Sequence, residues 1–447
     1  MKFLDDNTKY ALFLTPQWVV DFMVGLVDWN RYAGHDEVKI LEPGCGYAQF
    51  LKRIAISYPS LASKSKFYGV ELNPKLFRIL QSESLPVNFL LFNADYLLWQ
   101  PGLQFDLIIG NPPYGIPANS PHYKIKVSPE IKNQYKRQSK TWYGKYNLYG
   151  LFIEKSIKLL KNGGFLVFIV PATFMVLDDF KKLRKFLADN GQTQIIYLGS
   201  EVFKPAANVS VVILKYEKTP QKAGQLQLLE YKNNTIIEIF TRTKWSGEIV
   251  SFRTEYTDLI ESLYSYRLSD IYDIRISPRT SEIRRNPYIV KAESQPADGY
   301  LPLLTSKNLT DNGIIYNTVS SYWVAQENLG KIREFFKIPH IVVGLGFRGR
   351  SRILANYDAK CYPWFGDVYH LIPSSEKLFT HSKINEIEVM EYLNSHYVSR
   401  YVTDKFRDIV YHLSSTLLGV IPIPCPTNGG EKQCLNLNKA FTSQSQR

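Results

Sequence analysis

The feature that most constrains the fold is the alternation of short apolar runs with amphipathic helical patterns over residues 16–216. Runs typical of strands lie at 38–41, 66–71, 88–92, 106–110, 164–170, 194–198 and 209–216. Helical patterns occupy 16–28, 48–57, 74–82, 147–161 and 178–190. Strands separated by helices predict a doubly wound α/β sheet, in which ligands bind at the carboxyl ends of the strands. The last two runs have no helix between them, so we expect an antiparallel hairpin at the sheet edge.

The alternation fades after a polar stretch, EKTPQKAGQ at 217–225, which is typical of a linker. The chain has 447 residues, enough for more than one domain. We therefore expect a first domain over 1–225, a second domain of mixed α+β structure over 226–425, and a polar tail over 426–447.

Charge and composition narrow the class of partner. The net charge of +13 favours a polyanionic partner, nucleic acid before membrane. Seven of the ten Lys and Arg residues between Asn111 and Lys161 lie at 124–145, which fits either a solvated loop or a contact with a DNA backbone. The four cysteines form no C-x-x-C pair, so we expect no metal site. Because we find neither a signal-peptide pattern nor a long uncharged apolar run, we expect a soluble, cytoplasmic protein and no membrane partner.

Acidic residues stand at the ends of the first three predicted strands. Glu42 ends the first strand and precedes the tight turn Gly44-Cys45-Gly46, Glu71 ends the second, and Asp95 follows the third. Each acid alone fits a helix cap. Three of them on neighbouring strands favour a nucleotide site, where carboxylates accept from ribose hydroxyls and from an adenine amine.

The fourth strand leads into Asn111-Pro112-Pro113-Tyr114. The lone pair of an exocyclic aromatic amine is delocalised, so its methylation requires acceptors for the amine hydrogens rather than a nucleophilic side chain. Asn111 Oδ1 and the Pro112 carbonyl supply two acceptors, and the prolines stiffen their geometry. Tyr114 offers a ring face for stacking. An ordinary Asn-Pro turn is the alternative.

Taken together, Thr15-Pro16, EPGCG, Glu71, Asp95 and NPPY resemble the motifs of the γ class of DNA adenine-N6 methyltransferases. Longer segments, such as FDLIIGNPPYGI, AKCYPWFGDVYHL and GKYNLYGLFIEKSIKLLKNGGFLVFIVPATF, are most similar to the TaqI methyltransferase, and the resemblance covers most of the chain. It implies a Rossmann-like catalytic domain that binds S-adenosylmethionine, followed by a target-recognition domain. It also implies transfer of a methyl group to the N6 of an adenine flipped out of double-stranded DNA.

The resemblance carries roles to individual positions. Asn111, Pro112 and Tyr114 match the target-amine site, and Phe203 matches a second aromatic wall for the flipped base. The implied cofactor residues are Thr15, Glu42, Pro43, Gly44, Cys45, Glu71, Leu72, Asp95, Tyr96, Pro113 and Phe152. Thr15 followed by Pro16 also fits a helix N-cap with proline at the first helical position.

Basic residues are candidates for DNA binding. They are Lys124, Lys136, Arg137, Lys145, Lys307, Arg348, Arg350 and Arg352. Arginine contacts guanine or phosphate, so the bases read stay open. A protein-glutamine or rRNA adenine methyltransferase is the alternative function, although the glutamine enzymes lack such a second domain. We expect a monomer, and any cognate restriction endonuclease of a type II system would be a separate protein.

Overall fold

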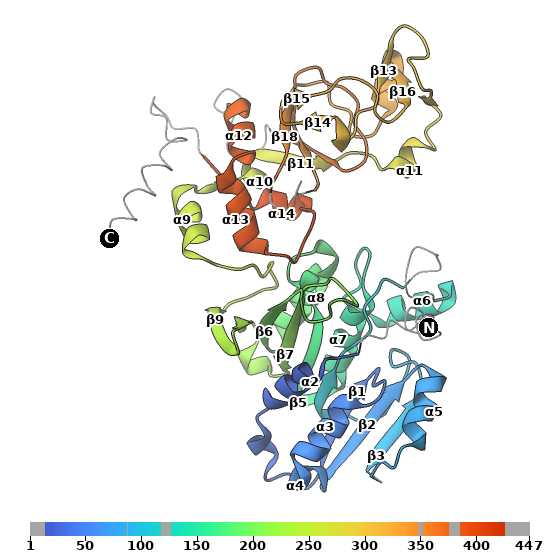
Figure 1. The fold of residues 1–447 in the computed structure, drawn as a ribbon, viewed down its shortest axis with the longest axis vertical. Helices are drawn as coiled ribbons and strands as arrows, with labels where there is room; N and C mark the ends of the chain where they lie inside the picture. The colour runs from blue at the N-terminus through green and yellow to red at the C-terminus, as the bar shows by residue number, and fades with distance from the viewer. Residues whose placement is uncertain (1–13, 87, 118–126, 347–351, 375–384, 425–447) are drawn as a thin grey trace. The chain divides into compact units, whose positions relative to one another are not determined.

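The computed structural model describes residues 14–86, 88–117, 127–346, 352–374 and 385–424. The chain divides into two compact units after Ser251 (Figure 1). The sequence placed this division after residue 225, and the polar tail it predicted lies outside the described residues. In the described part of the chain, no helix combines the length and the apolar character needed to cross a membrane.

Among the described residues of the first unit, nine strands form one sheet in the order β3-β2-β1-β4-β5-β7-β6-β8-β9. The strands are β1 (Val38–Pro43), β2 (Ser65–Glu71), β3 (Phe89–Asn93), β4 (Phe105–Gly110), β5 (Leu160–Pro171), β6 (Gln192–Gly199), β7 (Val211–Glu217), β8 (Leu226–Lys232) and β9 (Thr235–Arg242). The pairs from β3 to β5 are parallel, whereas β7 runs antiparallel to both β5 and β6. The α/β fold predicted from the sequence is thus present.

The predicted hairpin is antiparallel, but it does not lie at the sheet edge. Strand β8 pairs parallel with β6, and β9 pairs antiparallel with β8 and forms the edge of the sheet. The stretch 217–225 is therefore a connection inside the first unit rather than a linker. The reason is that Leu226 and Leu228 are buried and need a packed neighbour, which β6 provides.

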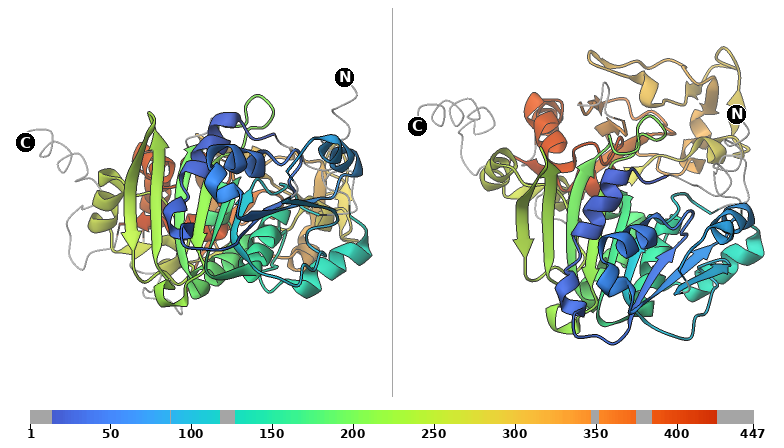
Figure 2. Two further views of the ribbon diagram at one scale, coloured as in Figure 1. Left: turned by 90° about the horizontal axis from the view of Figure 1, so that it is seen from below. Right: turned by 60° about the horizontal axis from the view of Figure 1, so that its bottom comes forward.

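Helices cover both faces of the sheet, with α2 and α3 on one face and α7 and α8 on the other (Figure 2). The helices are α2 (Gln17–Gly25), α3 (Gln49–Ser57), α4 (Pro59–Ala62), α5 (Pro74–Ser82), α6 (Pro129–Gln138), α7 (Leu148–Leu159) and α8 (Lys181–Asn190). All of β4 is buried, as expected for a parallel strand covered on both faces. Before α5, Asn73 Oδ1 accepts from Lys75 N at 3.0 Å and proline follows at the first helical position.

The second unit contains shorter strands and more irregular structure. In its described part, β11 (Tyr272–Ile276), β19 (Val368–Pro373), β17 (His340–Gly344) and β18 (Ala355–Asp358) form an antiparallel sheet in that order. The other strands are β10 (Tyr266–Arg267), β12 (Ile289–Lys291), β13 (Tyr300–Pro302), β14 (Leu309–Thr310), β15 (Gly313–Ile314), β16 (Tyr322–Ala325) and β20 (Pro422–Ile423). The helices are α9 (Glu255–Leu263), α10 (Leu268–Ile271), α11 (Thr280–Ile283), α12 (Glu386–Leu393), α13 (His396–Phe406) and α14 (Ser415–Gly419).

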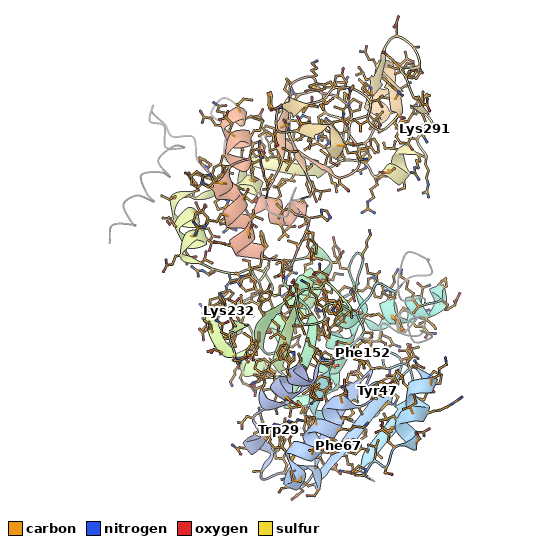
Figure 3. The ribbon with its side chains drawn as sticks, in the orientation of Figure 1. Trp29, Tyr47, Phe67, Phe152, Lys232 and Lys291 are labelled. Carbon is orange, nitrogen blue, oxygen red and sulfur yellow. The ribbon has the colours of Figure 1, made fainter. Side chains whose placement is uncertain are left out.

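Each unit has its own apolar interior, which the side chains in Figure 3 fill. In the first unit the core follows the central strands, and Phe67 of β2 is fully buried. In the second unit Val342, Trp364 and Val368 pack with Leu304 and Leu309. The second unit is thus a mixed α+β body, as the sequence predicted.

Candidate active site

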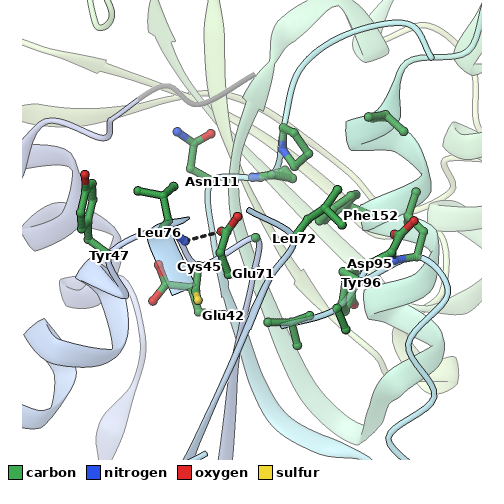
Figure 4. Close-up of a pocket in the computed structure, with 18 of the residues that line it drawn as sticks. Glu42, Cys45, Tyr47, Glu71, Leu72, Leu76, Asp95, Tyr96, Asn111 and Phe152 are labelled. Atoms are coloured by element: carbon green, nitrogen blue, oxygen red, sulfur yellow. Dashed lines mark hydrogen bonds between the residues drawn. The ribbon is translucent and has the colours of Figure 1, made fainter. Parts of the chain in front are cut away.

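A cavity of about 370 Å³ opens where the central strands of the large sheet end (Figure 4). The strand order β3-β2-β1-β4 brings the ends of these strands side by side. The predicted residues that line the cavity are Thr15, Glu42, Gly44, Cys45, Glu71, Leu72, Asp95, Tyr96, Asn111, Pro112, Pro113 and Phe152. Pro43, Tyr114 and Phe203 are not among the lining residues.

Glu42 is buried beneath the cavity at the end of β1. Its Oε2 accepts from Leu51 N at 3.1 Å, which ties the carboxyl group to α3. Burial raises the pKa of Glu42 to about 8, against the lowering effect of backbone hydrogen bonds from Leu51 and Phe50. A positively charged ligand beside Glu42 would favour its ionised form.

Glu71 is held by the glycine turn. Its Oε2 accepts from Gly46 N at 2.8 Å and its Oε1 from Asn73 N at 2.7 Å. Burial raises the pKa of Glu71, and these hydrogen bonds oppose the shift. Gly44 and Gly46 have φ of 66° and 54°, which favours glycine, and a Cβ on Gly44 would lie 3.7 Å from Phe152 and from Pro113. The conformation of the turn thus favours glycine at both positions, and both glycines line the cavity.

Asp95 is fixed by a residue that the sequence did not single out. Asp95 Oδ1 accepts from Leu97 N at 2.9 Å, and its Oδ2 accepts from the hydroxyl of Tyr135 at 2.6 Å. Tyr135 lies on α6, in the segment that the sequence read as a loop or a DNA contact. The signal for this helix was Ser128-Pro129, because Ser128 Oγ accepts from Ile131 N and proline occupies the first helical position.

Several other lining residues were also missed by the sequence. They are Leu14, Tyr47, Gln49, Phe50, Val70, Leu76, Ala94, Leu97, Val127, Ser128, Ile131 and Leu148, and Gly46, which the sequence named only as part of the glycine turn, lines the cavity as well. Most are apolar and differ in no local way from core residues. Some of them, such as Phe50 and Val70, are buried and others, such as Leu14, are exposed, and no local pattern says that a cavity borders them.

Asn111 leaves β4 at the rim of the cavity. Its Nδ2 donates to Thr15 Oγ1 at 3.1 Å, so the amide nitrogen faces Thr15. Thr15 does not cap α2, whose N-cap residue is Pro16. The following turn is pinned as well, because Asn147 Oδ1 accepts from Gly115 N at 2.8 Å. Tertiary hydrogen bonds therefore stiffen NPPY together with the prolines.

Tyr114 and Phe203 meet beneath this turn. Both rings are buried, and their centroids lie 6.2 Å apart at an interplanar angle of 75°. The Tyr114 hydroxyl donates to Ile169 O at 2.9 Å. The two aromatic residues predicted from the sequence are thus neighbours, but as an edge-to-face pair. A flat base between two ring faces would require them to separate.

The basic candidates lie elsewhere. Lys136, Arg137, Lys145, Lys307 and Arg352 are exposed and do not line the cavity. Arg352 lies 3.2 Å from Asp311, which offsets its charge. The remaining candidates lie outside the described residues: Lys124, Arg348 and Arg350.

Comparison with known proteins gives the family. Residues 65–203 match the Eco57I restriction-modification methylase family, and residues 301–423 match the TaqI-like C-terminal specificity domain. The chain is 37% identical over 426 residues to the type II methyltransferase M.TthHB8I of Thermus thermophilus, covering 94% of this chain and 92% of that protein. It is 43% identical over 131 residues to the restriction enzyme and methyltransferase RM.Eco57I of Escherichia coli, covering 29% of this chain and 13% of that protein.

A solved structure extends the likeness in fold. The type IIL restriction-modification enzyme MmeI, in complex with DNA, superposes with a TM-score of 0.54 at 12% identity, covering 96% of this chain and 69% of that one. The α/β sheet, the cavity at its strand ends and the similarity to M.TthHB8I over nearly the whole chain all indicate the same family. The chain belongs to the type II restriction-modification methyltransferases, S-adenosylmethionine-dependent enzymes that methylate DNA.

Proposed function

We propose that this protein transfers a methyl group from S-adenosylmethionine to the N6 of an adenine flipped out of duplex DNA, as a γ-class enzyme. The observation that carries the proposal is the position of Asn111 and Pro112, which follow β4 and line the same cavity as Glu42, Glu71 and Asp95. The match of the second unit to the TaqI-like specificity domain supports the class.

The cavity fits the cofactor chemically. Glu42, with Thr15, Gly44 and Cys45, would hold the methionine part, and Pro43 would act by setting the course of the backbone between Glu42 and Gly44. Glu71 would accept from the ribose hydroxyls, and Asp95 from the amino group of the cofactor's adenine. The adenine ring would lie against Leu72, Tyr96, Pro113 and Phe152. When bound, the cofactor supplies an electrophilic methyl group.

The residues of the chain supply orientation and hydrogen-bond acceptors. The amide nitrogen of Asn111 donates to Thr15. In this proposal the amide oxygen Oδ1 accepts a hydrogen bond from the target amine. The Pro112 carbonyl supplies a second acceptor from a rigid turn. Acceptors placed in advance stabilise the positive charge that develops on the amine without reorganising during the reaction.

An adenine in a duplex cannot reach such a cavity, so it must leave the helical stack, at a cost of a few kcal/mol. Stacking on Tyr114 and Phe203 would offset part of that cost, about 1–3 kcal/mol per contact. In this proposal the edge-to-face pair opens when the base enters. The second unit would read base edges, and the exposed Lys136, Arg137, Lys145, Lys307 and Arg352 would contact DNA. The enzyme would act as a monomer, with any cognate endonuclease separate.

One experiment tests the target. The protein is incubated with methyl-tritiated S-adenosylmethionine and, separately, with duplex DNA, ribosomal RNA and a release factor, and labelled nucleosides are separated by chromatography with mass spectrometry. We expect label in DNA as N6-methyladenine. N4-methylcytosine would contradict the target base, and label in RNA or protein alone would contradict the substrate class.

A further inference from the structure

We propose that Tyr135 is a positioning residue for the cofactor, because its hydroxyl fixes the carboxylate of Asp95 in the orientation that recognises the amino group of the cofactor's adenine. The inference rests on the role proposed above for Asp95. It extends that role to a residue of α6, which contributes no motif of its own.

Two donors hold the carboxylate from different directions. Leu97 N donates to Oδ1 at 2.9 Å, and the Tyr135 hydroxyl donates to Oδ2 at 2.6 Å. A carboxylate oxygen accepts up to two hydrogen bonds, so these donors fix the plane of the group and leave acceptor capacity for a ligand. A bond to a charged acceptor is among the stronger hydrogen bonds in proteins.

The two side chains differ in exposure in the way this role requires. Tyr135 is buried, whereas Asp95 is half-buried and borders the cavity. Burial, together with the negative charge of Asp95, raises the pKa of Tyr135 far above its usual range. The hydroxyl therefore stays protonated at neutral pH and can donate to Asp95.

Helix α6 is itself anchored, so Tyr135 is not free to drift. Directly after the helix, Ser139 Oγ and Thr141 Oγ1 donate to Glu154 Oε2 on α7 at 2.5 and 2.6 Å. Burial alone would raise the pKa of Glu154, but hydrogen bonds from Lys158 and these two hydroxyls outweigh it and lower the pKa. One turn before Tyr135, Ile131 also lines the cavity. The face of α6 that carries both residues is thus fixed to the first unit.

The ring of Tyr135 has a second role that the test must keep separate. It lines both the cofactor cavity and a neighbouring cavity of about 320 Å³, which also borders Glu154 and Lys155. Removing the whole side chain would join the two cavities and disturb packing. Tyr135→Phe keeps the wall and removes only the hydroxyl.

Recognition of an amine can be measured apart from general affinity. S-adenosylhomocysteine carries the amino group, whereas its deaminated analogue S-inosylhomocysteine carries a carbonyl oxygen there, which a carboxylate repels. A site built to accept from an N–H discriminates strongly against a ligand that lacks it. The ratio of the two dissociation constants therefore reports how well Asp95 is aimed.

The experiment measures both ligands by isothermal titration calorimetry on the wild-type protein, Tyr135→Phe and the matched control Tyr143→Phe. Tyr143 is exposed, and its ring lies beside Lys181. We expect the wild type to prefer the adenosine compound at least about tenfold. In Tyr135→Phe this ratio should fall at least about fivefold, with binding of the inosine compound unchanged within about twofold. The control should match the wild type.

The outcomes separate the inference from the proposal beneath it. Equal weakening of both ligands in Tyr135→Phe would mean that Tyr135 only maintains the wall, which overturns the inference while Asp95 keeps its role. A wild-type ratio near one would remove the role of Asp95 itself. In Asp95→Ala the ratio should be lost, and adding Tyr135→Phe should change it no further. If Tyr135→Phe does not fold, Tyr135→Met, which keeps an apolar side chain of comparable length and removes the hydroxyl, replaces it in the same comparison.

Discussion

Glu42 and Glu71 of the first unit and Asp358 of the second are buried acids in different surroundings. In the first unit, Glu42 and Glu71 lie at strand ends, accept backbone hydrogen bonds and still border a cavity of about 370 Å³. In the second unit, Asp358 is fully buried and surrounded by donors of its own unit. It accepts from Tyr316, Lys360, Tyr362 and Trp364 at 2.7–3.2 Å. Glu42 and Glu71 thus keep acceptor capacity beside the cavity that we propose as the cofactor site, whereas Asp358 is enclosed by donors and acts as a structural support.

Two buried histidines of the second unit, His340 and His370, also form all their hydrogen bonds within that unit. His340 Nδ1 lies 2.7 Å from the Ile338 carbonyl, which only accepts, so Nδ1 carries the proton. His340 Nε2 then accepts from His370 Nδ1 at 2.8 Å, and His370 Nε2 accepts from Ser277 at 2.8 Å. Every ring nitrogen is used while both rings stay neutral. A body of short strands gains order from such buried networks.

The largest expected effect is a loss of the methylation rate from a substitution in the first unit that leaves its fold intact. Asn111→Ala removes one proposed acceptor for the target amine and should lower the single-turnover methylation rate by about 100- to 1,000-fold. The dissociation constant for S-adenosylhomocysteine should stay within about threefold, because the carboxylates remain. Rapid-quench methylation and calorimetry give the two numbers. A variant with a normal rate would contradict the acceptor role.

The next largest effect is a loss of stability of the second unit that leaves the site in the first unit unchanged. Asp358→Asn replaces an acceptor by a donor facing Trp364 or Tyr316, which should lower the free energy of unfolding of this unit by about 3 kcal/mol. Thermal denaturation monitored by scanning calorimetry measures this loss. Cofactor binding, measured by titration calorimetry below the unfolding transition, should be unchanged. The control Asp311→Asn removes an exposed ion pair and should change stability by less than about 0.5 kcal/mol. Similar losses of stability in Asp358→Asn and Asp311→Asn would contradict the structural role of Asp358.

A smaller effect comes from pH and has opposite signs in the two units. Burial, and then His340, lowers the pKa of His370 to about 3 from 6.5, so the second unit should lose stability as pH falls below about 6.5, by about 2 kcal/mol at pH 5. Burial raises the pKa of Glu42 to about 8, so the ligand-free first unit should lose stability as pH rises from about 4.5 to 8. Scanning calorimetry from pH 5 to 8 measures both transitions.

The control for this comparison is His396→Gln, which removes an exposed histidine of the second unit and should leave its pH response unchanged. Replacing His370 by Asn should flatten that response between pH 5 and 6.5. Transitions that shift in the same direction with pH would show that the buried groups of the two units do not differ in this way.

The sequence predicted the first unit well because its signals are local. Runs such as 106–110 and 164–170 fall within β4 and β5, and polar residues directly after strands come together at one edge of a parallel sheet. This rule alone brings Glu42, Glu71, Asp95 and Asn111 to one cavity. The addition of β8 and β9 to the sheet was missed, because which strand pairs with which is not encoded in periodicity.

The amino-acid sequence by itself determined the α/β class, the strand ends that carry polar groups and the second α+β body, because period and residue type follow from backbone geometry. Only the tertiary structure decided which atoms meet: Tyr135 with Asp95, Asn111 with Thr15, and Tyr114 edge-on to Phe203. Such contacts join residues 40 to 96 positions apart. They depend on how helices pack on the sheet, which no local pattern specifies.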